Sequence, residues 1–228
     1  MTYTYALLLL SIVFFPLLLA HTRQFSFAGE WRRFAWVCIV LLLFFIPWDV
    51  AAHSIGHWWF NPEYTLPYTA IGLPLEEWGF FTAVSFSMLF LYVQLRRLSG
   101  AGAAYPPVSS RQYCLYYTAV LALAVILPAL ALLHVSYTAL VVLAAVCTLC
   151  LWRVFGTADR ALSAHLMLGF VFFFIYNYAL TSLPVVLYGS PWILGVRMLT
   201  IPVEDSLYNG VLLILIVLTY QMECRKKV

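Results

Sequence analysis

Two short segments of the sequence carry the same polar pattern in front of a long apolar run. Residues 73–81 read LPLEEWGFF, and residues 201–208 read IPVEDSLY. Each contains a proline followed, two residues later, by two adjacent carboxylates, and the segments lie 128 residues apart. Other unusual residues align at the same offset: Arg32 with Arg160, Asp49 with Asn177, Phe60 with Tyr188, and Phe80 with Tyr208. Several matches at one offset predict an internal repeat.

The composition around these segments is that of a membrane protein. The 228 residues are 64% apolar and 9% charged, whereas an average soluble domain has about 25% charged residues. A water-soluble globular protein is therefore excluded, and a net charge of +3 is too small to indicate nucleic-acid binding. Spans of about 20 residues account for nearly all the apolar residues. They are predicted at 5–19, 34–53, 76–95, 113–133, 137–155, 164–183 and 203–220.

The predicted fold is an all-α integral membrane protein with seven transmembrane helices in two parallel three-helix repeats joined by a linker helix. The first repeat is predicted at 1–98, a cytoplasmic linker and the fourth helix at 99–135, and the second repeat with a basic tail at 136–228. Three spans invert the chain, and the fourth restores its direction. The two copies are therefore expected to be related by an axis along the membrane normal.

The basic residues predict the orientation of the chain. Eleven of the twelve fall in alternate loops or in the tail, and Arg197 alone falls on the other side. By the positive-inside rule, the N-terminus is expected outside and the C-terminus in the cytoplasm, with a bacterial inner membrane as the location. The first span has no Lys or Arg before it, unlike a cleavable signal, and is expected to be retained.

Six of the nine carboxylates fall at the predicted outer ends of the helices or in the outer loops. An ionisable group at membrane depth is a functional candidate. Two adjacent carboxylates in a low dielectric do not both ionise at low cost, so such a pair can supply a general acid and a base. The alternative for the acidic pairs is ordinary helix capping. The predicted catalytic residues are Glu76, Glu77, Glu204, Asp205 and Asp49.

Aromatic and polar side chains gather around both segments. Their rings either belong to an interfacial aromatic belt or stabilise a cationic intermediate. Asp49, His53 and His57 share one predicted helical stripe, which leaves a metal site, a polar relay and simple hydration open. The second repeat has no histidine at the matching positions, so no metal is predicted. No cofactor is predicted either, since G-x-G-x-x-G, which would indicate a bound flavin or nicotinamide, does not occur. The predicted substrate-binding residues are Trp48, Trp59, Phe60, Phe80, Phe81, Tyr176, Asn177, Tyr188, Arg197 and Tyr208.

The motifs Trp48-Asp49, Trp59-Phe60-Asn61-Pro62 and residues 73–78, together with Gly195, Arg197 and residues 200–208, resemble the small flavin-independent integral-membrane lycopene cyclases in their fused two-repeat form. The resemblance implies a carotenoid end-group cyclase that converts the ψ ends of lycopene to β-ionone rings, giving γ- and β-carotene without net redox. It also implies lycopene in the bilayer as partner, with other enzymes of carotenoid synthesis as further partners. The alternative is a proton-coupled transporter of a hydrophobic small molecule.

The two repeats are not chemically equal. Asn177 stands where the first repeat has Asp49, and Arg197 is expected to hold Glu204 or Asp205 ionised. If the repeats form separate sites, the first is expected to be the stronger catalyst. If they line one shared cavity, the second is expected to act as base or cation stabiliser. Changes at Glu76 and Glu204 are expected to be more harmful than a change at Glu63.

Overall fold

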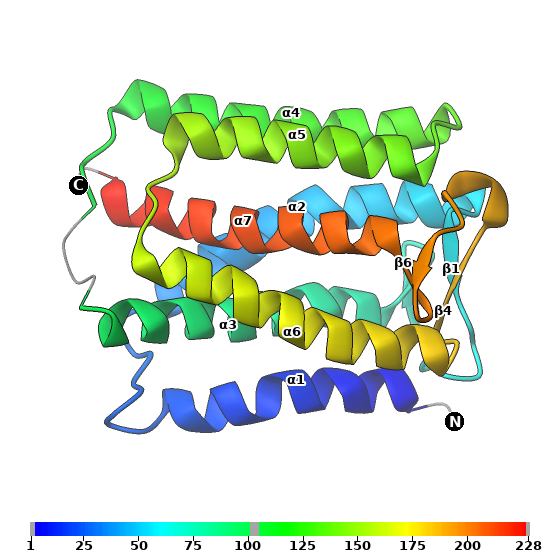
Figure 1. Ribbon diagram of the computed structural model, residues 1–228, viewed down its shortest axis with the longest axis horizontal. Helices are drawn as coiled ribbons and strands as arrows, with labels where there is room; N and C mark the ends of the chain where they lie inside the picture. The colour runs from blue at the N-terminus through cyan, green and yellow to red at the C-terminus, as the bar shows by residue number, and fades with distance from the viewer. Residues whose placement is uncertain (1–2, 101–104, 227–228) are drawn as a thin grey trace.

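The computed structural model describes residues 3–100 and 105–226, and over these ranges the chain is mostly helical (Figure 1). It forms seven α-helices: α1 (Thr4–Ala20), α2 (Trp31–Ile55), α3 (Leu75–Leu98), α4 (Ser110–Leu132), α5 (Tyr137–Phe155), α6 (Arg160–Ser182) and α7 (Val203–Arg225). Each predicted span falls on one of these helices, with ends that differ by at most five residues. The prediction of seven apolar helices is confirmed.

Helices α2 to α7 are each long and apolar enough to cross a membrane. Helix α1 is shorter, with 17 residues, and at 1.5 Å per residue it spans about 25 Å of a hydrocarbon core of about 30 Å. Pro16 lies inside α1 and cannot donate to the carbonyl of Ile12. Ser87 Oγ on α3 donates to that carbonyl instead, at 3.0 Å, and ties the two helices together.

Short strands, which hydropathy did not predict, occur in the loops between the helices. They are β1 (Trp58–Phe60), β2 (Thr69–Ala70), β3 (Leu73–Pro74), β4 (Val186–Tyr188), β5 (Arg197–Met198) and β6 (Ile201–Pro202), with a 3₁₀ turn at Ser190–Trp192. The bounds of β4, β5 and β6 equal those of β1, β2 and β3 shifted by 128 residues. The repeat found in the sequence is therefore a repeat of the backbone.

The strand pair β1–β4 lies between the repeats and shows how they are related. Trp59 pairs with Leu187, its own equivalent at the offset of 128, and the pairs Trp58–Tyr188 and Phe60–Val186 flank it. Trp58 corresponds to Val186 and Phe60 to Tyr188 at the same offset, so each flanking pair is the symmetry equivalent of the other. A two-fold axis between antiparallel strands produces this pattern. The copies are thus parallel, as the repeat predicted.

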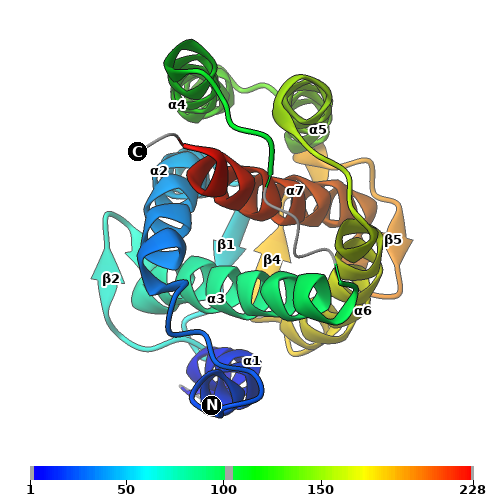
Figure 2. The ribbon, with the colours of Figure 1, turned by 90° about the vertical axis from the view of Figure 1, so that its left-hand side faces the viewer.

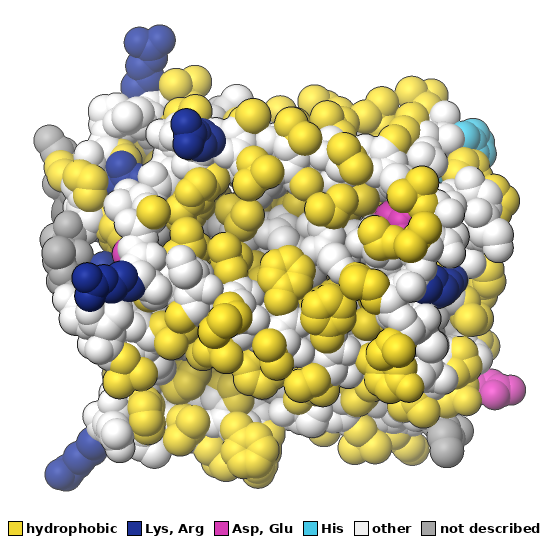
Figure 3. Space-filling view, in the orientation of Figure 1, with side chains coloured by type: hydrophobic (Ala, Val, Ile, Leu, Met, Phe, Trp, Pro, Cys, Tyr) yellow, Lys and Arg dark blue, Asp and Glu magenta, His cyan; other side chains and the backbone are white. Residues whose placement is uncertain are grey.

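Four helices surround the centre of the molecule, and three lie outside them. In the end view of Figure 2, α2, α3, α6 and α7 form a ring, with each helix packed against the next. Helix α1 packs on α3, α5 packs on α7 in the equivalent way, and α4 packs on α2. In Figure 3, most of the visible Lys and Arg side chains lie at one end of the molecule. This is the end at which α7 finishes in Figure 1. The orientation in the membrane stays a prediction.

Candidate active site

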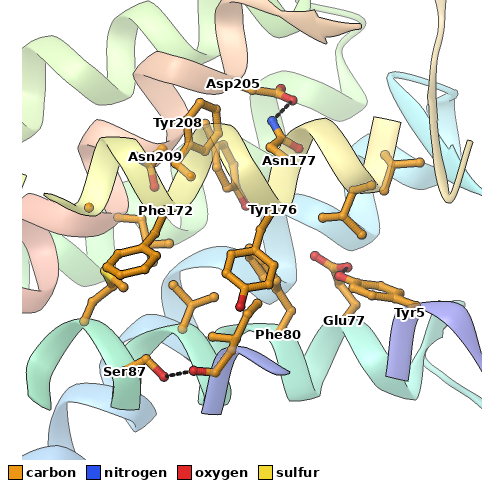
Figure 4. A pocket seen from close by; sticks show the side chains of 18 of the residues that line it. Tyr5, Glu77, Phe80, Ser87, Phe172, Tyr176, Asn177, Asp205, Tyr208 and Asn209 are labelled. Atoms are coloured by element: carbon orange, nitrogen blue, oxygen red, sulfur yellow. Dashed lines mark hydrogen bonds between the residues drawn. The ribbon is translucent and has the colours of Figure 1, made fainter. Parts of the chain in front are cut away.

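A cavity of about 430 Å³ lies inside the bundle and is lined by both repeats. Its wall includes residues of α1, α2, α3 and β1 from the first half of the chain, and of α5, α6, β4 and α7 from the second half. Three carboxyl groups line it, from Asp49, Glu77 and Asp205, and the rest of the wall is mainly apolar. Two of them, Glu77 and Asp205, are labelled in Figure 4. The two repeats therefore form one shared cavity.

Asp205, in the first turn of α7, is held by three neutral hydrogen-bond donors. Tyr137 Oη donates to Oδ1 at 2.9 Å, and Asn177 Nδ2 and Tyr188 Oη donate to Oδ2 at 2.9 and 2.5 Å. The carboxyl group is 5% exposed, so these donors replace the water that it lacks. Hydrogen bonds to a charged acceptor favour the charged form. The three donors thus stabilise the carboxylate form of Asp205 and offset part of the cost of burying its charge.

Asp49 and Glu77 form a different arrangement on the other side of the cavity. Tyr208 Oη donates to Asp49 Oδ1 at 2.9 Å, and Tyr5 Oη donates to Glu77 Oε2 at 2.6 Å. The two carboxyl groups also lie within interaction range of each other. Two neighbouring carboxyl groups in a low dielectric do not both ionise at low cost, which favours a proton on one of them. The Asp49–Glu77 pair is thus the candidate proton donor of the cavity.

The asymmetry follows from a few substitutions between the repeats. Asn177 replaces Asp49, and Tyr188 and Tyr208 replace Phe60 and Phe80. The second repeat therefore supplies an amide and two phenol groups that the first repeat lacks. Tyr188 lies on β4, outside the helices, and burial together with the negative charge of Asp205 raises the pKa of its hydroxyl well above the usual range. The hydroxyl keeps its proton and acts as a donor.

Glu76 and Glu204 are buried, but they are not part of the cavity lining. Glu76 Oε1 accepts from the backbone N–H of Leu66 at 2.5 Å, and Glu204 Oε1 accepts from that of Leu194 at 2.6 Å. Thr138 Oγ1 also donates to Glu204 Oε1. The two adjacent carboxyl groups of each repeat therefore have different surroundings. Glu76 and Glu204 bind the loop before the helix, whereas Glu77 and Asp205 line the cavity.

The predicted binding residues also divide into two groups. Phe60, Phe80, Tyr176, Asn177, Tyr188 and Tyr208 line the cavity. The other four do not: Trp48 and Phe81 are buried behind the wall, where Trp48 packs on Tyr208 with ring centroids 5.2 Å apart and Phe81 stacks on Phe45. Trp59 is 40% exposed at the centre of the β1–β4 pair.

Arg197 is the fourth predicted binding residue outside the lining, and it does not pair with an acid as expected. Its guanidinium donates to the carbonyl of Thr200 at 2.7 Å and lies 5.7 Å from the centre of the Tyr188 ring. Between the described residues, the ion pairs found are Arg33–Glu30 and Arg96–Asp159. Arg197 therefore makes no ion pair with Glu204 or Asp205, because the short β5–β6 hairpin turns the arginine back onto its own loop, and the expectation that it holds one of them ionised stays a prediction.

The histidine stripe is also corrected by the structure. Helix α2 ends at Ile55 because Gly56 adopts a left-handed conformation with φ of 79°, so His57 is not on the helix with Asp49 and His53. The described part of the chain contains no group of three or more His, Cys, Asp or Glu side chains placed to hold a metal ion. His57 is buried against Trp58, Tyr137 and Trp192.

Two tyrosines of the site were not predicted. Tyr5 and Tyr137 are the donors to the two cavity acids Glu77 and Asp205, and each lies in the first turn of the first helix of its repeat. They are 132 residues apart rather than 128, one helical turn out of the common register, so an alignment at a single offset does not pair them. Trp58 on β1 lines the cavity as well.

A seven-helix membrane bundle with an internal, aromatic and carboxyl-lined cavity is the class that this geometry defines. The chain matches the family described as lycopene cyclase over residues 2–95 and 131–222, which cover both repeats. It therefore belongs to the lycopene cyclase family and is an enzyme of the carotenoid cyclase class. The resemblance seen in the sequence is confirmed.

Solved structures show the same fold in a distant protein. The crystal structure of a mycobacterial Insig homolog, MvINS from Mycobacterium vanbaalenii, is 17% identical with a TM-score of 0.59, over 85% of this chain and 97% of that chain. A cross-linked trimer of MvINS is 18% identical with a TM-score of 0.57 over the same shares. At this identity the likeness shows a common fold alone. A search of curated proteins found no match.

Proposed function

We propose that this protein closes the acyclic ψ ends of lycopene to β-ionone rings by acid–base catalysis without net redox, with the Asp49–Glu77 pair as acid and Asp205 as base. The observation that carries the proposal is the contrast between the carboxyl groups of one cavity. Asp49 and Glu77 lie close to each other and accept from one tyrosine each, which favours a retained proton, whereas Asp205 accepts from three neutral donors, which stabilise its charged form. An isomerisation through a cation needs one group of each kind.

The first step is protonation of the terminal double bond of the ψ end. The Asp49–Glu77 pair gives its proton to C2, which breaks the C1=C2 π bond and leaves a tertiary cation at C1. The pair is then a charged, proton-poor dyad beside that cation, stabilised by the donors Tyr5 and Tyr208. Opposite charges in a dry cavity attract strongly, so the acid becomes a counter-ion after it has reacted.

Ring closure follows without any group leaving. The C5=C6 π electrons form the C6–C1 bond, and the positive charge moves to C5. The rings of Phe60, Phe80 and Trp58 line the cavity and can present their negative faces to this charge. Asp205 then accepts the proton from C6, whose bonding electrons become the C5=C6 double bond of the β ring. One proton enters and one leaves, so the mass is unchanged.

This scheme differs in detail from the simplest expectation, in which the adjacent Glu76 and Glu77 form the acid–base pair. Glu76 and Glu204 do not line the cavity, so we assign them to positioning of the loops through Leu66 and Leu194. The second repeat is assigned the base, as expected for a shared cavity. The direct test is expression in a lycopene-producing host, followed by extraction of pigments. We expect γ- or β-carotene from the native chain and unchanged lycopene from Asp205→Asn at equal protein level.

A further inference from the structure

The cavity reaches the surface of the bundle along one seam. The lining residues that are exposed are Ser11, Phe15 and Leu19 on α1 and Phe172 on α6, while the lining residues of the other elements are buried or half-buried. Phe15 is 68% exposed and Phe172 is 41% exposed. Ser11, Phe15 and Leu19 recur every four residues, so they form one stripe along α1. The cavity is thus open between α1 and α6.

This seam lies at membrane depth, below the carboxyl groups. Tyr5 marks the level of Glu77, and Ser11 to Leu19 follow it along α1 over about 9 to 21 Å at 1.5 Å per residue. Above the carboxyl groups, the cavity is capped by β1 and β4, where Trp58 and Phe60 are buried. A molecule dissolved in the surrounding lipid can therefore reach the opening of the cavity. A molecule in the outer water is separated from the cavity by β1 and β4.

Two polar contacts hold α1 against α3. Tyr5 fixes the outer end of α1 to Glu77 on α3, and Ser87 fixes the Ile12 carbonyl that Pro16 leaves free. Across the seam, the contact is weaker: Ser11 Oγ and Tyr176 Oη are 3.4 Å apart, at the long limit for two hydroxyl groups. In Figure 4, Tyr176 points from α6 into the cavity, on the side where its contact Ser11 lies on α1. This contact and the exposed rings of Phe15 and Phe172 lie at the seam.

We propose that the α1–α6 seam is the lateral entrance of the active site, through which an acyclic isoprenoid chain passes from the lipid with one end group leading. The proposal rests on the proposed function for the identity of the substrate. The cavity is capped at the carboxyl end and runs along α3 from Glu77 to Leu91, about 21 Å. It holds one end group and part of the polyene, and the rest of the chain lies in the seam and the lipid. Each binding event therefore closes one ring, and the second ring requires release and re-entry.

The test places a removable block in the seam. Ser11→Cys and Leu10→Cys are made in a chain whose five native cysteines are replaced, and each is modified with a lipid-permeant benzyl methanethiosulfonate. Leu10 is the matched control because it is 60% exposed on the same helix but does not line the cavity. We expect modification of Ser11→Cys to lower the lycopene cyclisation rate at least tenfold. A reducing agent that removes the benzyl group should restore the rate, and Leu10→Cys should change less than twofold.

A second pair of variants and a binding measurement complete the test. The pair Ser11→Trp and Leu10→Trp in the native chain tests the same point without cysteine replacement, and only the first should slow cyclisation. Binding of lycopene, followed by the shift of its polyene absorption, is measured in the same liposomes. Blocked binding at Ser11 supports the entrance even if no ring forms with any variant, whereas absence of rings alone counts against the proposed function. Equal binding and equal rates for the Ser11 and Leu10 variants would overturn the entrance.

Discussion

Tyr208 on α7 donates a hydrogen bond of 2.9 Å to Asp49 on α2, so a side chain of the second repeat holds a carboxyl group of the first. The equivalent of Tyr208 is Phe80, which has no hydroxyl, and the contact therefore has no counterpart in the other direction. The Tyr208 ring also packs on Trp48 and Phe45. Through this contact the two repeats depend on each other, although each carries its own acidic motif.

Replacing Tyr208 by Phe is expected to lower the cyclisation rate about ten- to a hundredfold. The ring and its packing remain, but the Asp49–Glu77 pair loses a donor that stabilises its charge after proton transfer, and a hydrogen bond to a charged group contributes about 1.5–3 kcal/mol. Initial rates with lycopene in liposomes measure the effect. Tyr220→Phe, in the same helix but outside the cavity lining, is the control. Equal rates for both variants would show that this contact plays no part in the reaction.

Glu77→Gln and Asp205→Asn are expected to be comparably severe, each lowering the rate about 10²- to 10⁴-fold, because one removes the acid and the other the base of a single site. Asp49→Asn is expected to fall in the same range, since it replaces one carboxyl group of the proposed acid pair by an amide that cannot exchange a proton at neutral pH. Glu63→Gln serves as the matched control, because Glu63 does not line the cavity. A harmless Glu77→Gln with an inactive Asp205→Asn would contradict the assignment of the acid.

Glu76→Gln and Glu204→Gln are expected to be much milder, within about tenfold of the native rate. Glutamine keeps a carbonyl oxygen that can accept from the amides of Leu66 and Leu194. Glu76→Leu, which cannot accept, should destabilise the loop instead and lower the midpoint of thermal inactivation. If Glu76→Gln lost activity as fully as Glu77→Gln at equal thermal stability, Glu76 would have to take part in proton transfer.

The stability of the protein should fall in weak acid partly because of His57. Burial lowers the pKa of His57 to about 4, whereas an exposed histidine has a pKa of about 6.5. Between these values the unfolded chain binds more protons than the folded one, so the folded state loses stability as the pH falls from about 6.5 toward 4. His57→Gln should reduce the difference between the thermal inactivation midpoints at pH 7.5 and pH 5. An unchanged difference would show that His57 does not contribute.

Much of the architecture could be predicted from the sequence because hydropathy and the repeat depend on many residues at once. The spans follow from apolar length, and the parallel copies follow from the offset that relates Glu76 to Glu204 and Asp49 to Asn177. The two- and three-residue strands could not be predicted, since a pattern of alternation needs a longer segment. The boundaries of the repeats at residues 98 and 136 stay predictions.

The site could be predicted in kind but not in arrangement. The acidic motifs place two carboxylates in one helical turn, yet successive residues on a helix point about 100° apart, so Glu76 and Glu77 face different surroundings. Which one meets the cavity depends on how α3 and α7 are rotated in the ring of four helices. The donors Tyr5 and Tyr137 were missed because α1 and α5 are shifted by one turn against the common offset.

The most direct test of the account is a single-turnover cyclisation of lycopene by excess protein equilibrated in D₂O, with the product analysed by mass spectrometry and NMR. No redox cofactor is added. If the Asp49–Glu77 pair supplies the proton and Asp205 removes the one at C6, each ring should carry one deuterium at C2, and Glu77→Gln should form little labelled product. Rings without deuterium, or rings that appear only when reduced flavin is added, would contradict the proposed acid–base mechanism.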